Sequence, residues 1–221
     1  MNTAPYAHCL VRAVVKILRK IDHRTRSLRC LIGILPLLLN AGGSESLPPF
    51  EVVDIEARKT TVGAPRGRGA NVFIFILRDC PLSNQYQPTI RRLAEAFEPL
   101  GIRFHLIHTD PNTTVEEARH HAEEYAIRES VYLDPKHELV EKLSATISPE
   151  AVVLSSTNQK LYQGRINNLY VKLGQKRFRV TQHDLKKTLT DITAGREIVP
   201  RTTPAIGCFI PTRESALPQA R

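Results

Sequence analysis

The chain has 221 residues, enough for one domain of ordinary size with extensions at its ends. Because 42% of the residues are hydrophobic and only 24% are charged, the composition excludes an intrinsically disordered chain. The formal net charge is +9, but residues 1–43 contribute +6 of it through seven Lys or Arg residues against Asp22. The remainder carries only +3, which argues against a nucleic-acid-binding domain.

The N-terminal region joins a basic stretch to a short apolar run, Cys30–Leu39 (CLIGILPLLL), followed by small residues. This order is typical of a secretory signal peptide. We predict that residues 1–43 are an export signal, so that the protein is periplasmic or otherwise in the cell envelope. An uncleaved membrane anchor is the alternative, although the run is short and interrupted by Gly33 and Pro36. A third interpretation of the basic stretch is an amphipathic helix over Leu10–Ile21 on a membrane surface.

The domain itself is predicted at residues 44–199. After a polar linker, Phe50–Ile55 (FEVVDI) indicates an edge strand. Lys59–Gly69 is rich in Gly, Pro and Arg, which favours an exposed loop in which Arg66 and Arg68 are solvated.

The strongest functional signal lies at the end of the next strand. The apolar run Val72–Leu77 predicts a buried central strand, and Cys80 follows where that strand stops. Ser83 or Asn84 can cap the helix that comes next. The sulfur of Cys80 is therefore expected near the positive end of a helix, where unpaired N–H groups favour a thiolate.

Strands and helices then alternate. Ile102–His108 predicts a second central strand, and Thr113 or Thr114 caps a helix that runs to about Tyr125. A short strand follows at Val131–Leu133, and a further helix at His137–Ser144. The alternation predicts an α/β domain whose sheet is partly parallel.

A family resemblance is carried by the strand, by the sequence Cys80-Pro81-Leu82-Ser83-Asn84 and by the Pro88-bearing helix. These features resemble the thioredoxin-like redoxin family, which includes thioredoxins, thiol peroxidases and copper chaperones. The similarity runs from about Pro48 to about Ile198 and extends in detail to exported AhpC/TSA-type redoxin domains with a CP(I/L)SN motif. It implies a thioredoxin-like fold, with a central mixed sheet flanked by helices, and thiol chemistry at Cys80 without a cofactor.

The same resemblance assigns a role to Pro149, which stands just before the apolar strand Ala151–Leu154. The family places a cis-proline there, facing its active-site cysteine. We therefore expect a cis Ser148–Pro149 bond, with Pro149 shaping the groove beside the sulfur. The backbone of Ser148 is then expected to meet an extended substrate peptide.

The remaining segments complete the domain. Leu161–Ile166 is expected to return as a hairpin strand, and Asn167–Gln182 reads as an insertion with basic and aromatic residues. That insertion is either a docking site or simply an ordered surface loop. Thr181–Ala194 predicts a closing helix capped by Thr181, and residues 200–221 an irregular tail.

The cysteines define the redox question. Of the four, Cys9 and Cys30 are lost if the signal is cleaved, which leaves Cys80 and Cys208. A Cys-x-x-Cys motif is absent because Ser83 holds the fourth position; its hydroxyl can stabilise the Cys80 thiolate but cannot close a disulfide. Cys208, in a flexible setting beside glycine, is the candidate resolving cysteine. A static disulfide, or two cysteines that never meet, are the alternatives.

Two other functions of the family fit less well. Peroxiredoxins carry a threonine where this chain has Leu77, although Arg78 and Arg165 can supply positive charge. Copper chaperones of this fold need a second cysteine where this chain has Asn84. Both remain as alternatives, the second as a non-enzymatic or copper-handling module.

The histidines indicate no metal site. His105 and His108 are three residues apart on a strand and should face opposite sides, and His120 and His121 are expected on a helix surface. We therefore predict an exported thiol-disulfide oxidoreductase without metal or nucleic acid. Its partners are protein thiols or disulfides, including an envelope electron-transfer protein, and the N-terminal segment associates it with a membrane.

Overall fold

The computed structural model describes residues 46–63 and 69–211. The chain separates into two compact units, residues 1–42 and 43–221, and all described residues belong to the second. The export signal or anchor expected at residues 1–43 lies outside the described residues, as do Arg66 and Arg68. No helix in the described ranges is long and apolar enough to cross a membrane.

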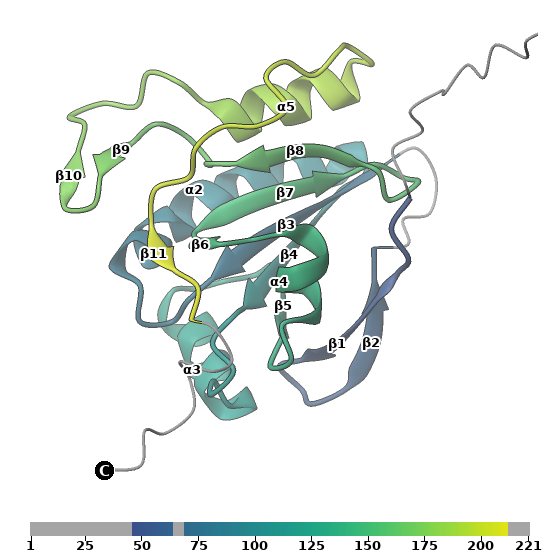
Figure 1. Ribbon diagram of the computed structural model, residues 1–221, viewed down its shortest axis with the longest axis vertical. Helices are drawn as coiled ribbons and strands as arrows, with labels where there is room; N and C mark the ends of the chain where they lie inside the picture. Colours follow the sequence, from purple (N-terminus) through teal and green to yellow (C-terminus); the bar gives the residue numbers. More distant parts are fainter. Residues whose placement is uncertain (1–45, 64–68, 212–221) are drawn as a thin grey trace, which may run out of the picture. The chain divides into compact units, whose positions relative to one another are not determined.

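A seven-stranded sheet forms the centre of the domain, in the order β2-β1-β5-β4-β3-β7-β8 (Figure 1). The strands are β1 (Phe50–Asp54), β2 (Lys59–Val62), β3 (Ala70–Ile76), β4 (Ile102–His108), β5 (Ser130–Leu133), β7 (Glu150–Leu154) and β8 (Lys160–Gly164). The pairs β3–β4 and β4–β5 are parallel, and the other neighbours are antiparallel. The sheet is therefore mixed, and β3, an interior strand between β4 and β7, is buried along its whole length.

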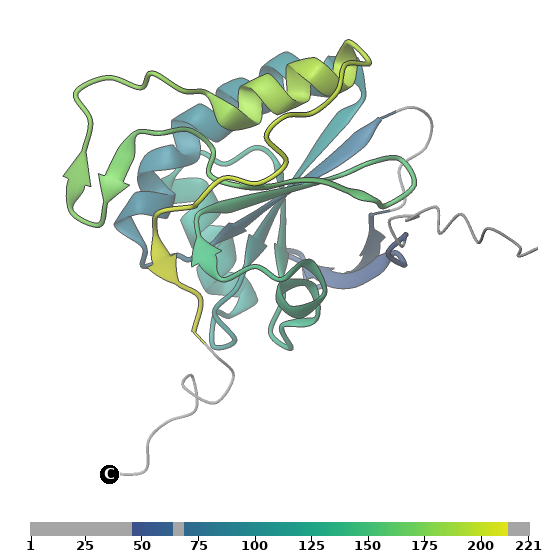
Figure 2. The ribbon, with the colours of Figure 1, turned by 45° about the horizontal axis from the view of Figure 1, so that its top comes forward.

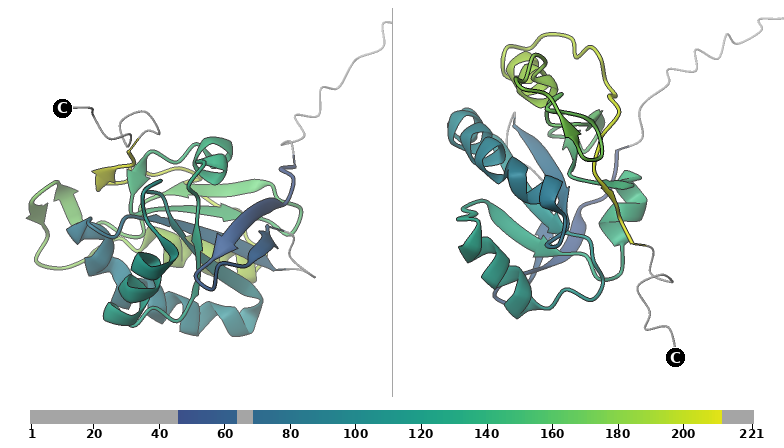
Figure 3. Two further views of the ribbon diagram at one scale, coloured as in Figure 1. Left: turned by 90° about the horizontal axis from the view of Figure 1, so that it is seen from below. Right: turned by 90° about the vertical axis from the view of Figure 1, so that its left-hand side faces the viewer.

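Helices cover both faces of the sheet. They are α2 (Pro81–Phe97), α3 (Val115–Glu124), α4 (Glu138–Leu143) and α5 (Asp184–Thr193), with a 3-10 turn, η1 (Glu98–Leu100), after α2. Alternate side chains of β3 enter two cores: Val72 and Ile74 pack with α2, α3 and α5, whereas Phe73 and Phe75 pack with α4. Accordingly, α2 and α5 lie side by side on one face, and α4 covers the other (Figures 2 and 3).

Two predictions near the N-terminus are wrong: the strand at Phe50 is not at the edge of the sheet, because β2 lies outside it, and part of the expected loop is itself a strand. Lys59–Val62 is the edge strand β2, not part of a loop, and it covers β1. The β-branched residues Thr60, Thr61 and Val62 suit a strand, and Val62 pairs with Phe50. The glycines and arginines that follow concealed this short strand in the sequence pattern.

Two helix caps differ from expectation, and the cap of α3 is one of the two residues expected. Thr114, not Thr113, caps α3, because its side chain and that of Glu117 form a reciprocal capping box. Thr181 does not cap α5, which begins after His183; its hydroxyl instead accepts a hydrogen bond from Asn168. Helix α2 begins directly after Cys80, so its cap position is the cysteine itself.

The inserted segment and the tail contain additional strands. β9 (Tyr170–Lys172) and β10 (Gln175–Lys176) form a two-stranded ribbon, and β11 (Cys208–Phe209) pairs with β6 (Ile147–Ser148). The tail was predicted to be irregular, but it runs from α5 along β8 and ends against β6 (Figure 1). Backbone hydrogen bonds to neighbouring strands, which no local pattern reveals, hold it in this path.

Candidate active site around Cys80

Cys80 occupies the N-cap of α2, four residues after Ile76, where β3 ends. Its extended backbone (φ −94°, ψ 108°) leads into a helix whose first turn contains Pro81 and no acidic residue. The thiol therefore lies at the positive end of the helix, with no carboxylate in that turn to oppose a thiolate. The side chain is only 1% exposed, so the sulfur is covered in this conformation.

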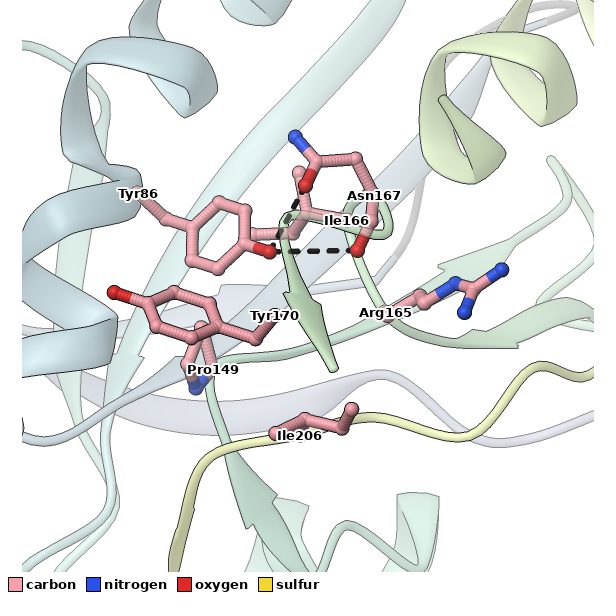
Figure 4. Close-up of a pocket in the computed structure, with 7 residues that line it drawn as sticks. All are labelled: Tyr86, Pro149, Arg165, Ile166, Asn167, Tyr170 and Ile206. Carbon is pink, nitrogen blue, oxygen red and sulfur yellow. Dashed lines mark hydrogen bonds between the residues drawn. The ribbon is translucent and has the colours of Figure 1, made fainter. Parts of the chain in front are cut away.

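The strand across from Cys80 supplies its hydrogen-bond partner. The Cys80 thiol donates to the carbonyl oxygen of Ser148, 3.4 Å away. The Ser148–Pro149 peptide bond is cis, as the sequence predicts. Pro149 also lines a small pocket with Tyr86, Tyr170 and others (Figure 4).

Cys208 reaches the same position from the C-terminal segment. In the β11–β6 ladder it is the direct partner of Ser148. Both cysteines are free. Burial, followed by the interaction with the neighbouring Cys80, raises the pKa of Cys208 to about 12. The fold thus brings together two cysteines that are 128 positions apart in the sequence.

Close backbone packing brings β11 to this position. A Cβ atom on Gly207 would lie 2.0 Å from the Ser148 carbonyl oxygen, so only glycine permits the approach. Earlier in the same C-terminal segment, the buried Thr203 shares a 2.5 Å hydrogen bond with the Tyr162 hydroxyl. The Thr203 N–H donates to the carbonyl of Gln163 at 3.1 Å. The flexible setting predicted for Cys208 is therefore, in this structure, a docked strand.

Ser83 lies in the first turn of α2, buried beneath the surface. Its hydroxyl has no hydrogen-bond partner among the described residues. The predicted hydrogen bond to Cys80 is thus not made here. A serine hydroxyl can, however, rotate so that its O–H donates to a new acceptor. Its stabilisation of the Cys80 thiolate stays a prediction.

Asn84 fixes the loop that carries Cys80, a role that the sequence analysis missed. Its amide nitrogen donates to the carbonyl of Arg78 at 2.8 Å, and its amide oxygen lies 2.9 Å from Nε2 of His121. Because an amide oxygen only accepts, His121 must donate from Nε2. His121 is 1% exposed, contrary to the prediction of a surface residue. The sequence feature that indicates this burial is the spacing of His121 from Ala118 and Ala122, which lie on the buried side of α3.

The strand histidines are both buried, on opposite faces as predicted. His105 stacks on Phe73, and His108 packs edge-on against His121 with ring centroids 5.1 Å apart. Burial lowers the pKa of His105 to about 4 and that of His108 to about 3. Burial also lowers the pKa of His121. All three therefore stay neutral in the folded protein at physiological pH.

The two arginines considered for peroxide chemistry are paired with carboxylates. Arg78 contacts both Asp79 and Glu117, and Arg165 binds Asp184 at 2.8 Å. Neither guanidinium is therefore free to polarise an oxygen beside Cys80. Among residues 46–63 and 69–211, no group of three or more His, Cys, Asp or Glu side chains is arranged to hold a metal ion.

No family model and no curated protein matches the sequence. Solved structures do resemble the fold. An uncharacterized conserved protein from Geobacillus kaustophilus is 22% identical, with a TM-score of 0.66 over 76% of this chain and 90% of its own. A hypothetical protein from Sinorhizobium meliloti 1021 is 19% identical, with a TM-score of 0.63 over 74% and 90%. MTB dsbF, solved in mixed oxidized and reduced forms, is 13% identical, with a TM-score of 0.50 over 65% and 94%.

These likenesses concern the fold. All three are less than 25% identical to this chain, so they inform its fold alone. The chain has a thioredoxin-like α/β fold, with a central mixed sheet flanked by helices, as the sequence predicts.

Proposed function

We propose that this protein is an exported thiol-disulfide oxidoreductase in which Cys80 attacks and Cys208 resolves. The observation that carries the proposal is that Cys208 pairs in the β11–β6 ladder with Ser148, the residue whose carbonyl oxygen accepts the hydrogen bond from the Cys80 thiol at the N-terminus of α2. A thiolate at Cys80 gains from the helix dipole, and a second thiol stands close to the sulfur that it must attack. Export is supported by the signal-like run Cys30–Leu39.

The reaction proceeds in two exchanges. The Cys80 thiolate attacks a substrate disulfide, forms a mixed disulfide and releases one substrate thiolate. The Cys208 thiolate then attacks the Cys80 sulfur, which forms the Cys80–Cys208 disulfide and releases the second substrate thiolate. The substrate gains two electrons and the cysteine pair loses two, so an external dithiol, such as that of an envelope electron-transfer protein, must reduce the pair again.

The neighbouring groups have defined roles in this scheme. Ser83 donates a hydrogen bond to the Cys80 thiolate, and Pro149 shapes the groove beside the sulfur. Because Cys80 is covered while Cys208 pairs with Ser148, β11 must shift before a substrate disulfide can reach the sulfur. The partner is therefore a protein thiol or disulfide in an extended segment, which can pair with the freed Ser148 backbone.

The proposal is tested on the full chain with Cys9 and Cys30 replaced by Ser, so that only Cys80 and Cys208 react. The reduced protein is mixed with a disulfide-bonded peptide, and the products are mapped by mass spectrometry. The parent should form the Cys80–Cys208 disulfide and release the peptide thiols, whereas the Cys208→Ser variant should retain peptide on Cys80. Cys80→Ser should do neither. A parent that forms no Cys80–Cys208 disulfide would overturn the proposal, and an inert Cys80 that binds Cu(I) would support the binding-module alternative.

A further inference from the structure

The segment between β9 and α5 carries a second feature that the redox chemistry does not use. Residues 171–179 (VKLGQKRFR) form an unbroken run of exposed positions, which we call the arm. The ribbon of β9 and β10 makes up most of it and projects away from the central sheet (Figures 1 and 2). The arm is thus a protrusion whose side chains face solvent.

Exposed apolar side chains gather on the arm. Of the six large hydrophobic residues exposed in the described chain, three belong to it: Val171, Leu173 and Phe178. Val171 lies in β9, and Leu173 lies in the turn that joins β9 to β10. Phe178 is fully exposed and packs on nothing. Three large exposed apolar side chains within nine residues are more than the single scattered residues that a protein surface ordinarily shows, and such a concentration indicates an interaction surface.

The charge of the arm is entirely positive. It holds Lys172, Lys176, Arg177 and Arg179, and no acidic residue occurs between Glu150 and Asp184. None of the four forms an ion pair with a described residue. Arg78 and Arg165, by contrast, are each held by carboxylates. The arm therefore presents unneutralised charge, which is complementary to an anionic surface.

Both ends of the arm are anchored to the domain. Asn168 accepts hydrogen bonds from the N–H groups of Thr181 and Gln182, both at 3.0 Å, which joins the chain before the arm to the chain after it. At the foot of β9, the buried Tyr170 packs against Tyr86 of α2 with ring centroids 6.0 Å apart. The protrusion is thus built on a fixed base beside the active site (Figure 4).

We propose that the arm docks this domain on an anionic phospholipid surface, with Val171, Leu173 and Phe178 inserted among the lipids. Apolar side chains flanked by lysine and arginine are the combination that holds a protein at such an interface. A nine-residue arm cannot supply the roughly 20–30 residues per side that a stable protein interface uses. Single-stranded nucleic acid would need aromatic platforms, and two of the three apolar residues are aliphatic.

The position of the arm determines where docking would place the Cys80 site. Tyr170, at its foot, contacts α2, the helix whose first residue follows Cys80. Docking therefore holds the Cys80 end of the domain close to the lipid headgroups. Substrates that are themselves at the membrane surface would then meet the cysteine pair directly.

The test uses tryptophan fluorescence, because the chain contains no tryptophan. In the full chain, Phe178→Trp places the only indole on the arm. With vesicles of equimolar phosphatidylglycerol and phosphatidylcholine, its emission should shift to shorter wavelength and be quenched by bromine-labelled acyl chains. The matched control is Leu100→Trp, at an exposed apolar position in η1, which should show neither change. Vesicles of phosphatidylcholine alone should leave both proteins unchanged.

The charge requirement is tested in the same protein. Replacing Lys172, Lys176 and Arg179 by Gln in the Phe178→Trp chain should weaken the quenching titration by about fivefold per charge removed. Sedimentation shows how much protein is vesicle-bound, so binding through residues 1–43 is separated from contact by the arm. An indole at position 178 that stays unquenched, whether the protein is bound or not, would overturn the proposal. Quenching by a single-stranded oligonucleotide but not by lipid would overturn it equally.

Discussion

Cys208 pairs backbone to backbone with Ser148, the residue whose carbonyl oxygen accepts the hydrogen bond from the Cys80 thiol. Ser148 thus contacts both cysteines. The distance between the two sulfurs is therefore set by strand pairing and not by a short sequence spacing. Cys80 is 1% exposed while β11 is paired, so we expect exposure of its thiol to report whether β11 is docked.

Gly207→Ala should release β11. The added Cβ would lie 2.0 Å from the Ser148 carbonyl oxygen, and overpacking of this kind costs about 1–3 kcal/mol. Because Cys80 reacts only when β11 opens, its alkylation rate should rise by about tenfold or more. The rate is measured by mass spectrometry with a bulky maleimide on the native protein.

Gly69→Ala is the matched control for that variant. Its Cβ would also lie 2.0 Å from a backbone carbonyl oxygen, that of Gly101, near the start of β3 and β4. It should lower the free energy of unfolding without exposing Cys80. If both variants accelerate alkylation equally, then a general loss of stability, and not the contact between Gly207 and Ser148, controls the exposure of Cys80.

The reactivity of Cys208 should depend on the state of Cys80. Its pKa of about 12 rests first on burial and then on the interaction with Cys80. Replacing Cys80 by Ser removes the thiolate charge, so alkylation of Cys208 should begin at lower pH than in the parent. Alkylation profiles against pH, resolved by peptide mass, check this. Coincident profiles would leave burial as the sole cause.

The raised pKa of Cys208 also determines how the free energy of unfolding changes with pH. Since the folded pKa of Cys208 is raised, the thiol form is favoured by folding. This contribution to stability is complete below the ordinary pKa of 9.0 and is lost as pH rises from there to about 12. Cys208→Ser should therefore lose less stability than the parent across that range, as measured by urea unfolding.

The buried histidines should make the fold sensitive to acid. His108 has an ordinary pKa of 6.5 that folding lowers to about 3, so its neutral form is favoured in the native state. Stability from this group is complete above pH 6.5 and falls by about 1.4 kcal/mol per pH unit below it. His108→Leu should flatten the dependence of unfolding free energy on pH. His120→Leu, at an exposed position on α3, should leave the slope as it is.

Asn84→Ala should destabilise the loop before α2. It removes the hydrogen bond to the Arg78 carbonyl and the acceptor for His121, which should cost about 1–3 kcal/mol of unfolding free energy. Asn84→Asp keeps an acceptor for His121 but cannot donate to Arg78, so its loss should be smaller. Urea denaturation compares the three proteins, and an alanine variant as stable as the parent would contradict the assigned role.

Some features of the site depend on local sequence and were therefore predictable. The apolar run Val72–Leu77 predicts the buried strand β3, and a helix after Cys80 places the thiol at its positive end, although that helix begins at Pro81 and not after Ser83 or Asn84. Ile102–His108 is a strand with the bounds that its pattern predicts. By contrast, strand β2 was missed, because its only signal is a run of three β-branched residues. The burial of His121 was also missed, because only two alanines mark the buried face of its helix.

The sequence by itself determined the α/β class, the central strand and the place of Cys80, because hydrophobic period, turn residues and helix starts are local properties. Only the tertiary structure decided that Cys208 lies beside Cys80. That contact depends on strand pairing between β11 and β6, 60 residues apart at Cys208 and Ser148, and on the absence of a side chain at Gly207. Long-range backbone pairing leaves no periodic trace in a single sequence, so the covering of Cys80 and its pairing with Cys208 became visible only in the fold.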